Sequence, residues 1–334
     1  MGKVRWGVLG VAKIATEKVI PAMQQGTLSE ITAIASRQEA RARRAASALG
    51  IAKAYGSYEA LLADPEVDAI YIPLPNHLHV PWSIKALEAG KHVLCEKPIA
   101  MTAGEVEALI AARDRSGLLV AEAFMVRHHP QWLKVKEVVN SGQLGTVQAM
   151  HCFFSYHNVD PDNVRNKANI GGGGLLDIGC YPINLSRFVF HREPVRVSAL
   201  IEYDTAFKTD RLASALLDFG RSVHVTFTCS TQLSAYQRFV FVGDKARLEV
   251  EIPINALSGK AMRLVVDPGQ DLVGSGRQVL DLPACDQYTL QGDAFSAAIR
   301  GQGGVATTLE DSRANMRVLD AIFRSGKSGR WETP

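Results

Sequence analysis

Short, nearly all-apolar runs alternate with amphipathic segments through the first third of the chain. The runs occupy residues 4–10, 31–36, 67–75, 91–98 and 118–123. Helical patterns accompany them near residues 13–25, 38–49, 57–63, 79–89 and 102–116. Strands that are apolar on both faces are typical of a parallel sheet covered by helices on both sides. The alternation therefore predicts βαβ units that build a doubly wound parallel sheet, an α/β architecture.

The pattern changes after about residue 123. A helical pattern near residues 130–141 precedes a strand pattern at 147–157 and a helical pattern at 181–190. Several strand patterns then follow one another between residues 195 and 252, and helical patterns return near 289–300 and 309–325. Consecutive strands predict an α+β domain with a mostly antiparallel sheet. We therefore divide the chain into domains of residues 1–122 and 123–334.

Composition and charge exclude several classes of protein. A chain of 334 residues can form two domains with a core each, and a formal net charge of +3 predicts no polybasic surface for nucleic acid or membranes. The five cysteines are scattered without a C-x-x-C pair, which is typical of reduced thiols. We recognise no leader segment and no bilayer-length apolar run. We expect a cytoplasmic protein with no nucleic-acid or membrane partner and no metal site.

A glycine-containing turn follows the first predicted strand. It reads Gly10-x-Ala12-x-x-Ala15, a weakened form of G-x-G-x-x-G. Small residues at these positions allow a tight turn, close approach of a pyrophosphate and packing of the next helix on the strand. Small residues also begin many ordinary helices. The position between the first strand and the first helix favours dinucleotide binding, with Gly10, Ala12, Lys13 and Ile14 at the cofactor.

The end of the second predicted strand distinguishes the two nicotinamide cofactors. An NAD site places an acidic residue there for the ribose hydroxyls, but this chain has Ser36 and Arg37. A hydroxyl and a guanidinium suit a 2′-phosphate. The other interpretation is a helix-capping serine followed by an exposed arginine. We predict NADP as the cofactor, with NAD as a possibility.

Three other strand ends carry unusual residues. Ligands of doubly wound sheets bind beyond the carboxyl ends of the strands, so the loops at residues 73–79, 96–98 and 122–129 are expected to face the cofactor. The cofactor-binding residues predicted in them are Pro73, Asn76, His79, Glu96, Lys97 and Arg127. His77 and His79 have no matching cluster of carboxylates or thiols, so cofactor contact or capping is favoured over metal binding.

In the second domain, Asp177 and Tyr181 are four residues apart after a run of glycines. Residues at this spacing share one face of a helix. Pro182 fits only the first helical turn, so the helix should begin at about residue 179 or 180. Asp177 is then either a functional acid or an ordinary helix cap.

Three motifs together resemble the glucose–fructose oxidoreductase / inositol dehydrogenase (Gfo/Idh/MocA) family. They are Gly10-x-Ala12-x-x-Ala15, Glu96-Lys97-Pro98 and the stretch from Gly172 to Tyr181. The resemblance implies an NAD(P)-binding Rossmann domain followed by an α+β domain with a large, mostly antiparallel open sheet. It also implies homodimers or homotetramers formed through that sheet.

The resemblance assigns catalytic roles. Lys97 matches the lysine that contacts the reacting hydroxyl, Tyr181 the acid/base position, and Asp177 the carboxylate of the substrate site. Members such as the inositol dehydrogenases have histidine where this chain has Tyr181. The tyrosine is more similar to NADP-dependent aldose dehydrogenases and dihydrodiol dehydrogenases.

Hydride transfer explains why these residue types are needed. Removing a hydride from a carbinol carbon requires loss of the hydroxyl proton, and a free tyrosine with a pKa near ~10 is a poor base at neutral pH. A nearby ammonium such as that of Lys97 favours the phenolate and stabilises the oxyanion. The residues predicted to bind substrate are Lys97, Phe154, Arg165, Asp177 and Tyr181.

We therefore expect an enzyme, an NADP-dependent oxidoreductase acting on the CH–OH group of a sugar or polyol, with an aldose such as xylose or glucose favoured. Three alternatives stay open: a trans-dihydrodiol dehydrogenase-like enzyme, a non-catalytic dinucleotide-binding regulator, and a hydrolase that uses bound NAD in a transient redox cycle.

Overall fold

The computed structural model describes residues 2–334 and divides the chain into two compact units. The first unit comprises the chain up to His128 together with Asp286–Arg313, and the second comprises His129–Cys285 and Ala314–Pro334. The predicted boundary at residues 122 and 123 is therefore corrected, because residues 123–128 and 286–313 pack with the first unit. No helix in the described part of the chain is both long and apolar enough to cross a membrane.

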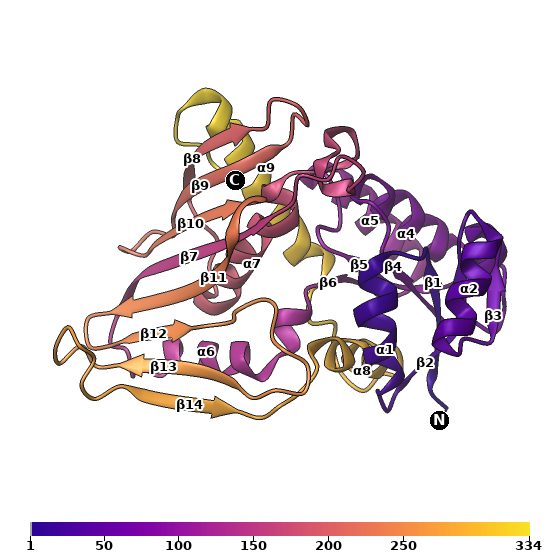
Figure 1. Cartoon of the computed structure of the whole chain (residues 1–334), viewed down its shortest axis with the longest axis horizontal. Helices are drawn as coiled ribbons and strands as arrows, with labels where there is room; N and C mark the ends of the chain where they lie inside the picture. Colours follow the sequence, from indigo (N-terminus) through magenta and orange to yellow (C-terminus); the bar gives the residue numbers. More distant parts are fainter. Residues whose placement is uncertain (1) are drawn as a thin grey trace. The chain divides into compact units, whose positions relative to one another are not determined.

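The first unit contains a six-stranded parallel sheet in the order β3-β2-β1-β4-β5-β6 (Figure 1). Its strands are β1 Val4–Leu9, β2 Ser29–Ala35, β3 Lys53–Tyr55, β4 Ala69–Ile72, β5 His92–Glu96 and β6 Val120–Ala123. The predicted doubly wound α/β sheet is confirmed. The strand order reverses between β1 and β4, the place where such sheets bind ligands.

Helices cover both faces of this sheet. They are α1 Ile20–Gln24, α2 Glu39–Leu49, α3 Tyr58–Leu62, α4 His79–Glu88, α5 Ala103–Ser116 and α8 Gln287–Ile299. Local signals set their ends: in α5, the Thr102 hydroxyl accepts a hydrogen bond from the Glu105 amide, and Gly117 ends the helix with φ +67°. A π-helical turn, Ala15–Val19, leads directly into α1.

Helix α8 explains why a late segment belongs to the first unit. The Phe295 ring lies 5.7 Å from the Trp6 ring, and the Trp6 indole donates to the Ser296 hydroxyl at 3.1 Å. Trp6 is completely buried. The core of the first unit is therefore completed by residues that follow the second unit's strands in the sequence.

The second unit contains an eight-stranded sheet in the order β14-β13-β12-β11-β7-β10-β9-β8. The strands are β7 Val147–His157, β8 Arg196–Tyr203, β9 Asp210–Asp218, β10 His224–Ser230, β11 Gln232–Gly243, β12 Arg247–Val250, β13 Met262–Asp267 and β14 Gln278–Leu282. Only β7 and β10 pair in parallel, so the predicted mostly antiparallel α+β sheet is confirmed.

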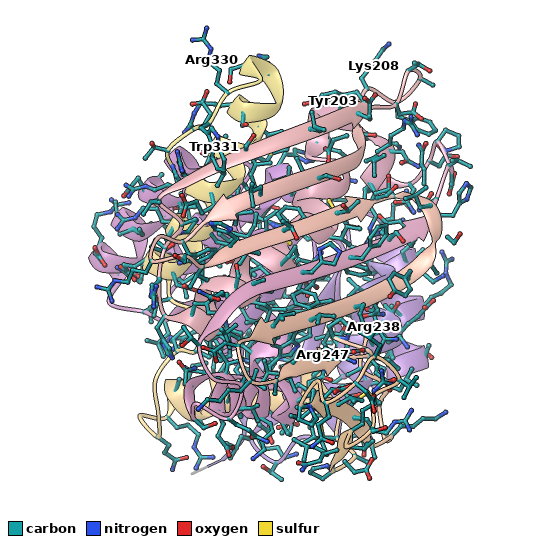
Figure 2. The ribbon with its side chains drawn as sticks, turned by 90° about the vertical axis from the view of Figure 1, so that its left-hand side faces the viewer. Tyr203, Lys208, Arg238, Arg247, Arg330 and Trp331 are labelled. Atoms are coloured by element: carbon teal, nitrogen blue, oxygen red, sulfur yellow. The ribbon has the colours of Figure 1, made fainter. Side chains whose placement is uncertain are left out.

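One face of the second sheet is packed against helices. In α6, Pro130–Asn140, the Trp132 ring meets the Phe239 ring edge-on at 5.1 Å, and in α7, Cys180–Phe190, Phe190 contacts Phe241 at 6.0 Å. Helix α9, Leu309–Ser328, contacts β8 through Ser325, whose hydroxyl accepts from the Ala199 amide. In Figure 2 the strands lie in front of these helices, and Tyr203 lies on that side, half exposed. The sheet is open on that face.

Candidate active site

The carboxyl edge of the parallel sheet gathers the predicted cofactor residues of the first unit. Gly10 follows β1, Ser36 follows β2, Pro73 follows β4 and Lys97 follows β5. All six strands are parallel and these four are neighbours, so their following residues share one edge. Four residues of the first unit that are far apart along the chain therefore lie at one edge of the sheet, on either side of the switch point between β1 and β4.

The Gly10 turn has the geometry that a pyrophosphate requires. Gly10 has φ +107°, and a Cβ there would lie 3.0 Å from a Leu74 methyl group, so only glycine fits without strain. The helical backbone that follows places the Thr16 amide on the Ala12 carbonyl at 3.0 Å. The amides before Thr16 form the positive end of that helix, which suits a phosphate group. This turn fits the predicted dinucleotide.

Lys13 and Ile14, in the same turn, differ in the exposure of their side chains. The Lys13 side chain is exposed and its ammonium lies 3.9 Å from Glu17. Ile14 is partly buried against the core. Lys13 therefore remains available to a ligand, whereas the Ile14 side chain serves packing and can offer the ligand its backbone.

Two arginines lie near the end of β2. The Ser36 hydroxyl accepts a hydrogen bond from the Gln38 amide, and Gln38 rather than Ser36 is the N-cap of α2. Burial raises the pKa of Tyr58, and the charges of Arg37 and Arg41 lower it. The Tyr58 hydroxyl lies 3.6 Å from the position a Gly10 Cβ would take. Arg37 and Arg41 thus place positive charge beside the glycine turn.

His79 does not lie where we predicted. The ring is fully buried, with Nδ1 2.7 Å from the Pro98 carbonyl oxygen and Nε2 2.7 Å from the Leu74 carbonyl oxygen. Burial lowers the pKa of His79 to about 4. Because both nitrogens face backbone carbonyls, the predicted cofactor contact of His79 is wrong. The ring instead connects the loop after β4, which carries Asn76, to the turn after β5.

Glu96 and Lys97, at the end of β5, have different surroundings. Glu96 Oε1 accepts a 2.7 Å hydrogen bond from the buried Tyr71 hydroxyl. The pKa of Tyr71 is raised, mainly by burial and also by the negative charge of Glu96. Lys97 is partly buried, and its positive charge contributes to the lowered pKa of His79. The peptide bond between Lys97 and Pro98 is cis. Glu96 therefore has a partner on β4, and Lys97 is the residue presented at the turn.

Arg127 is buried in an ion pair. Its guanidinium lies 2.7 Å from the Asp311 carboxylate, and its side chain is 7% exposed. The predicted cofactor role of Arg127 is thus replaced by a contact that holds residues 286–313 against the segment after β6.

In the second unit, Asp177 is the centre of a small polar cluster. Its Oδ2 atom accepts from the Tyr156 hydroxyl at 2.6 Å and from Arg165 Nε at 2.9 Å. Burial, followed by the Asp177 charge, raises the pKa of Tyr156, and the same charge raises the pKa of Arg165. Tyr156 is not among the residues that we predicted to bind substrate; from the sequence it is one of three aromatic residues of the 147–157 strand pattern, for which stacking on a sugar ring and core packing are equal alternatives.

Tyr181 lies on the same helical segment as Asp177. A π-helical turn, Leu175–Gly179, runs directly into α7, Cys180–Phe190. The helical backbone therefore begins before the predicted residue 179 or 180, and Pro182 lies beyond its first turn. Pro182 has no amide hydrogen, and the Cys180 thiol lies 3.6 Å from the Asp177 carbonyl oxygen. The Tyr181 ring is nearly buried and lies 6.2 Å from the Phe154 ring. Phe154 therefore fixes the ring of the predicted acid/base residue.

The glycine run before this segment accommodates Asp210. The Leu175 amide donates to Asp210 Oδ2, and a Cβ on Gly173, which has φ +122°, would lie 1.9 Å from Asp210 Oδ1. Burial raises the pKa of Asp210 to about 7. The glycines let this buried carboxylate reach backbone amides at the start of the helix. In the described residues no group of three or more His, Cys, Asp or Glu side chains could hold a metal.

Family comparisons cover both units. Residues 4–124 match the profile described as "Oxidoreductase family, NAD-binding Rossmann fold", and residues 132–249 match "GFO/IDH/MocA C-terminal domain". The chain belongs to the GFO/IDH/MocA oxidoreductase family. The predicted resemblance and the predicted nicotinamide dinucleotide cofactor are thereby confirmed.

Three relatives illustrate the range of the family. An uncharacterized oxidoreductase, ORF334 of Rhizobium meliloti, is 46% identical, with 100% of each chain covered. D-xylose 1-dehydrogenase (NADP(+)) 2 of Haloferax volcanii is 35% identical over 97% of this chain and 98% of its own. Trans-1,2-dihydrobenzene-1,2-diol dehydrogenase of Mus musculus is 31% identical over 74% of each chain.

Among solved structures, KijD10, a 3-ketoreductase from Actinomadura kijaniata in complex with NADP and TDP-benzene, is 31% identical with a TM-score of 0.91. The match covers 97% of this chain and 98% of that one. Structures of KijD10 variants in which a tyrosine is replaced by phenylalanine or a lysine by alanine match as well.

Proposed function

We propose that this oxidoreductase transfers a hydride between NADP(H) and a carbinol carbon of a sugar or polyol, with a free aldose such as xylose or glucose favoured. The observation that carries the proposal is that each unit presents its own part of the expected site: Lys97 lies at the carboxyl edge of the first unit's sheet, and Asp177 and Tyr181 lie on one helical segment of the second unit. The same number of residues separates Lys97 from Tyr181 as separates the lysine and tyrosine substituted in KijD10.

The choice of NADP rests on the end of β2. Ser36 and Arg37 stand where an NAD site has an acid, and Arg41 adds a second guanidinium beside Tyr58. A 2′-phosphate binds such groups through charge-assisted hydrogen bonds. The amides after Gly10 would hold the pyrophosphate. The bound nicotinamide would supply or accept the hydride.

Proton transfer is assigned to the chain's own residues. Tyr181 takes the proton of the reacting hydroxyl in oxidation and returns it in reduction. The Lys97 ammonium stabilises both the phenolate and the negative charge that develops on the substrate oxygen. Asp177, oriented by Tyr156 and Arg165, accepts a hydrogen bond from another substrate hydroxyl. Phe154 supports the Tyr181 ring.

A spectrophotometric screen tests the proposal. D-xylose, D-glucose, myo-inositol and trans-1,2-dihydrobenzene-1,2-diol are each incubated with NADP or NAD, and absorbance of the reduced cofactor is followed. We expect reduction of NADP with at least one aldose. Turnover of the diol alone would favour the dihydrodiol reading, and a clear preference for NAD would contradict the role of Ser36 and Arg37.

Reduction of a keto sugar is a second candidate, favoured by the full-length similarity to the ketoreductase KijD10. The same tyrosine would donate the proton. Oxidation of NADPH by a 3-keto sugar, faster than aldose oxidation under matched conditions, would identify this as the working direction.

The proposal also includes the oligomeric state and the cellular location of the enzyme. The exposed side chains Leu200, Tyr203 and Tyr236 in strands β8 and β11 of the open sheet support assembly into a homodimer or homotetramer through that sheet. Within the described residues no cysteine forms a disulfide, which fits the predicted cytoplasmic location. Sedimentation of the purified chain gives its oligomeric state.

A further inference from the structure

The peptide group that follows Lys97-Pro98 is held at both ends by buried side chains. The Ile99 amide donates to Glu122 Oε1 at 2.9 Å, and the Pro98 carbonyl oxygen lies 2.7 Å from His79 Nδ1. These two atoms belong to one peptide unit. Glu122 comes from β6 and His79 from the start of α4. Two separate elements therefore contact the peptide group that follows Lys97-Pro98.

Burial makes these contacts effective. His79 is fully buried, Glu122 is 2% exposed and Ile99 is fully buried. Hydrogen bonds in a dry interior are stronger than in water, and an unmade one there is costly. His79 Nε2 lies 2.7 Å from the Leu74 carbonyl oxygen. A neutral ring has a single N–H and donates to either Pro98 or Leu74, whereas the protonated ring donates to both.

We propose that Glu122 and His79 are positioning residues, which aim the Lys97 ammonium by fixing the Pro98–Ile99 peptide between them. The proposal rests on the proposed function, because it assigns Lys97 to catalysis. Neither residue touches the reacting atoms. Glu122 acts through the peptide group, and His79 acts through the same group and through the Leu74 carbonyl, so replacing either residue is expected to change the chemical step more than cofactor binding.

Paired variants separate the hydrogen bond from mere packing. Glu122→Gln keeps an acceptor for the Ile99 amide, whereas Glu122→Leu removes it. His79→Asn places a donor near the Nδ1 position, facing Pro98, whereas His79→Gln reaches toward the Nε2 position, facing Leu74. Ser296→Ala is the matched control, because Ser296 is a buried polar residue of the same unit that contacts Trp6 and Ser29 instead.

The first measurement needs no substrate. Hydrogen exchange of the Ile99 amide is followed by NMR in each variant, with NADP affinity measured in parallel. We expect Glu122→Leu to accelerate exchange at Ile99 by about 10- to 100-fold relative to neighbouring buried amides, and Glu122→Gln to restore the protection. Should Glu122→Leu fail to fold, Glu122→Asp, which shortens the reach of the carboxylate, is used instead. Unchanged local protection overturns the proposal.

The second measurement is turnover of D-xylose or D-glucose with NADP, as a function of pH. We expect Glu122→Leu and His79→Gln to lower kcat about 10- to 100-fold and to shift the pH profile, with the Kd for NADP within about twofold. Glu122→Gln and His79→Asn should retain more of the turnover than their partners, and Ser296→Ala should leave the profile in place. Equal losses within each pair, or unshifted pH profiles, overturn the proposal.

Lys97→Met distinguishes the two levels of inference. If Lys97→Met turns over normally, the proposed function fails. If Lys97→Met is inactive while Glu122→Leu and His79→Gln keep normal kcat and pH profiles, the positioning role fails and the proposed function stands.

Discussion

Tyr181 and Lys97 carry the proton-transfer chemistry that we propose. Tyr181→Phe removes only the hydroxyl, so the ring keeps its contact with Phe154. Lys97→Met removes the ammonium group with its charge and its N–H donors and keeps most of the apolar part of the side chain. We expect each variant to lower kcat by about 10²-fold or more while binding NADP with nearly normal affinity.

The matched control for this prediction is Tyr236→Phe, because Tyr236 is a half-exposed tyrosine of the second unit's sheet. Steady-state kinetics on the identified substrate and fluorescence titration with NADPH provide the two readouts. Normal turnover in both Tyr181→Phe and Lys97→Met would contradict the assigned roles.

Arg37 is expected to decide between the two nicotinamide cofactors. Arg37→Ala removes a guanidinium that we place at the 2′-phosphate, and a charge-assisted hydrogen bond contributes about 1.5–3 kcal/mol. We therefore predict a 10- to 100-fold weaker Kd for NADP with little change for NAD, measured by calorimetric titration. Arg43→Ala is the control, since its guanidinium pairs with Glu39 on the same helix. Equal losses for NADP and NAD would contradict the prediction.

Individual residues also show what a sequence cannot reveal. Gly10, Lys97 and Tyr181 can be predicted as site residues because their motifs are defined by residue type and by spacing along the sequence. His79 was misassigned because nothing in its neighbourhood shows that Leu74 and Pro98 will present carbonyls to both ring nitrogens. The hydrogen bond from Tyr156 to Asp177 could not be predicted, because the two residues come from different elements.

Helix α7 depends on the glycine run that precedes it. A Cβ at Gly173 would lie 1.9 Å from Asp210 Oδ1, and its φ of +122° is unfavourable for any other residue. We predict that Gly173→Ala lowers the free energy of unfolding by at least about 2 kcal/mol, as measured by urea denaturation.

The comparison for this prediction is Gly104→Ala, where the nearest atom to a new Cβ is the Thr102 hydroxyl at 3.8 Å. This position lies in the first turn of α5, and we expect no loss of stability there. If Gly173→Ala unfolds at the same urea concentration as Gly104→Ala, the steric argument is wrong.

At the level of elements, long apolar or periodic segments were predictable and short half-buried ones were not. The strand at residues 147–157 and the helices near 130–141 and 181–190 agree closely with β7, α6 and α7. Strands β3, β13 and β14 lie outside every predicted strand pattern, although β13 alternates buried with more exposed positions and carried a detectable pattern. β3 has three partly exposed residues and β14 has exposed positions throughout most of its length, so neither has an apolar pattern to detect.

For the whole molecule, the stability depends on pH through two buried groups whose pKa values are shifted in opposite directions: that of Glu122 is raised and that of His79 is lowered. Burial raises the pKa of Glu122 to about 7 from 4.5, with Asp311 raising it and Arg127 lowering it. The folded protein therefore holds an additional proton between these values, and stability falls as pH rises through that interval. For His79 the folded pKa is about 4 against 6.5, so stability falls as pH decreases from 6.5 toward 4.

Glu122→Gln isolates one of these two effects. Because one pKa unit corresponds to 1.36 kcal/mol, the variant should gain up to about 3 kcal/mol relative to the wild type as pH rises from 4.5 to above 7. Urea denaturation at pH 5, 6, 7 and 8 measures the difference. A constant difference across this range would contradict the prediction.

The division of the chain into units has a consequence for protein synthesis. The polypeptide passes between the two units at residues 128 and 129, again at 285 and 286, and again at 313 and 314. Trp6 must therefore remain without its partner Ser296 until nearly the entire chain has left the ribosome. We predict that arrested nascent chains ending at His128 are protease-sensitive within their first unit, and that resistance appears only once residues 286–313 have emerged from the exit tunnel. In this protein the amino-terminal unit is translated first, but it cannot be completed until most of the second unit has been synthesised.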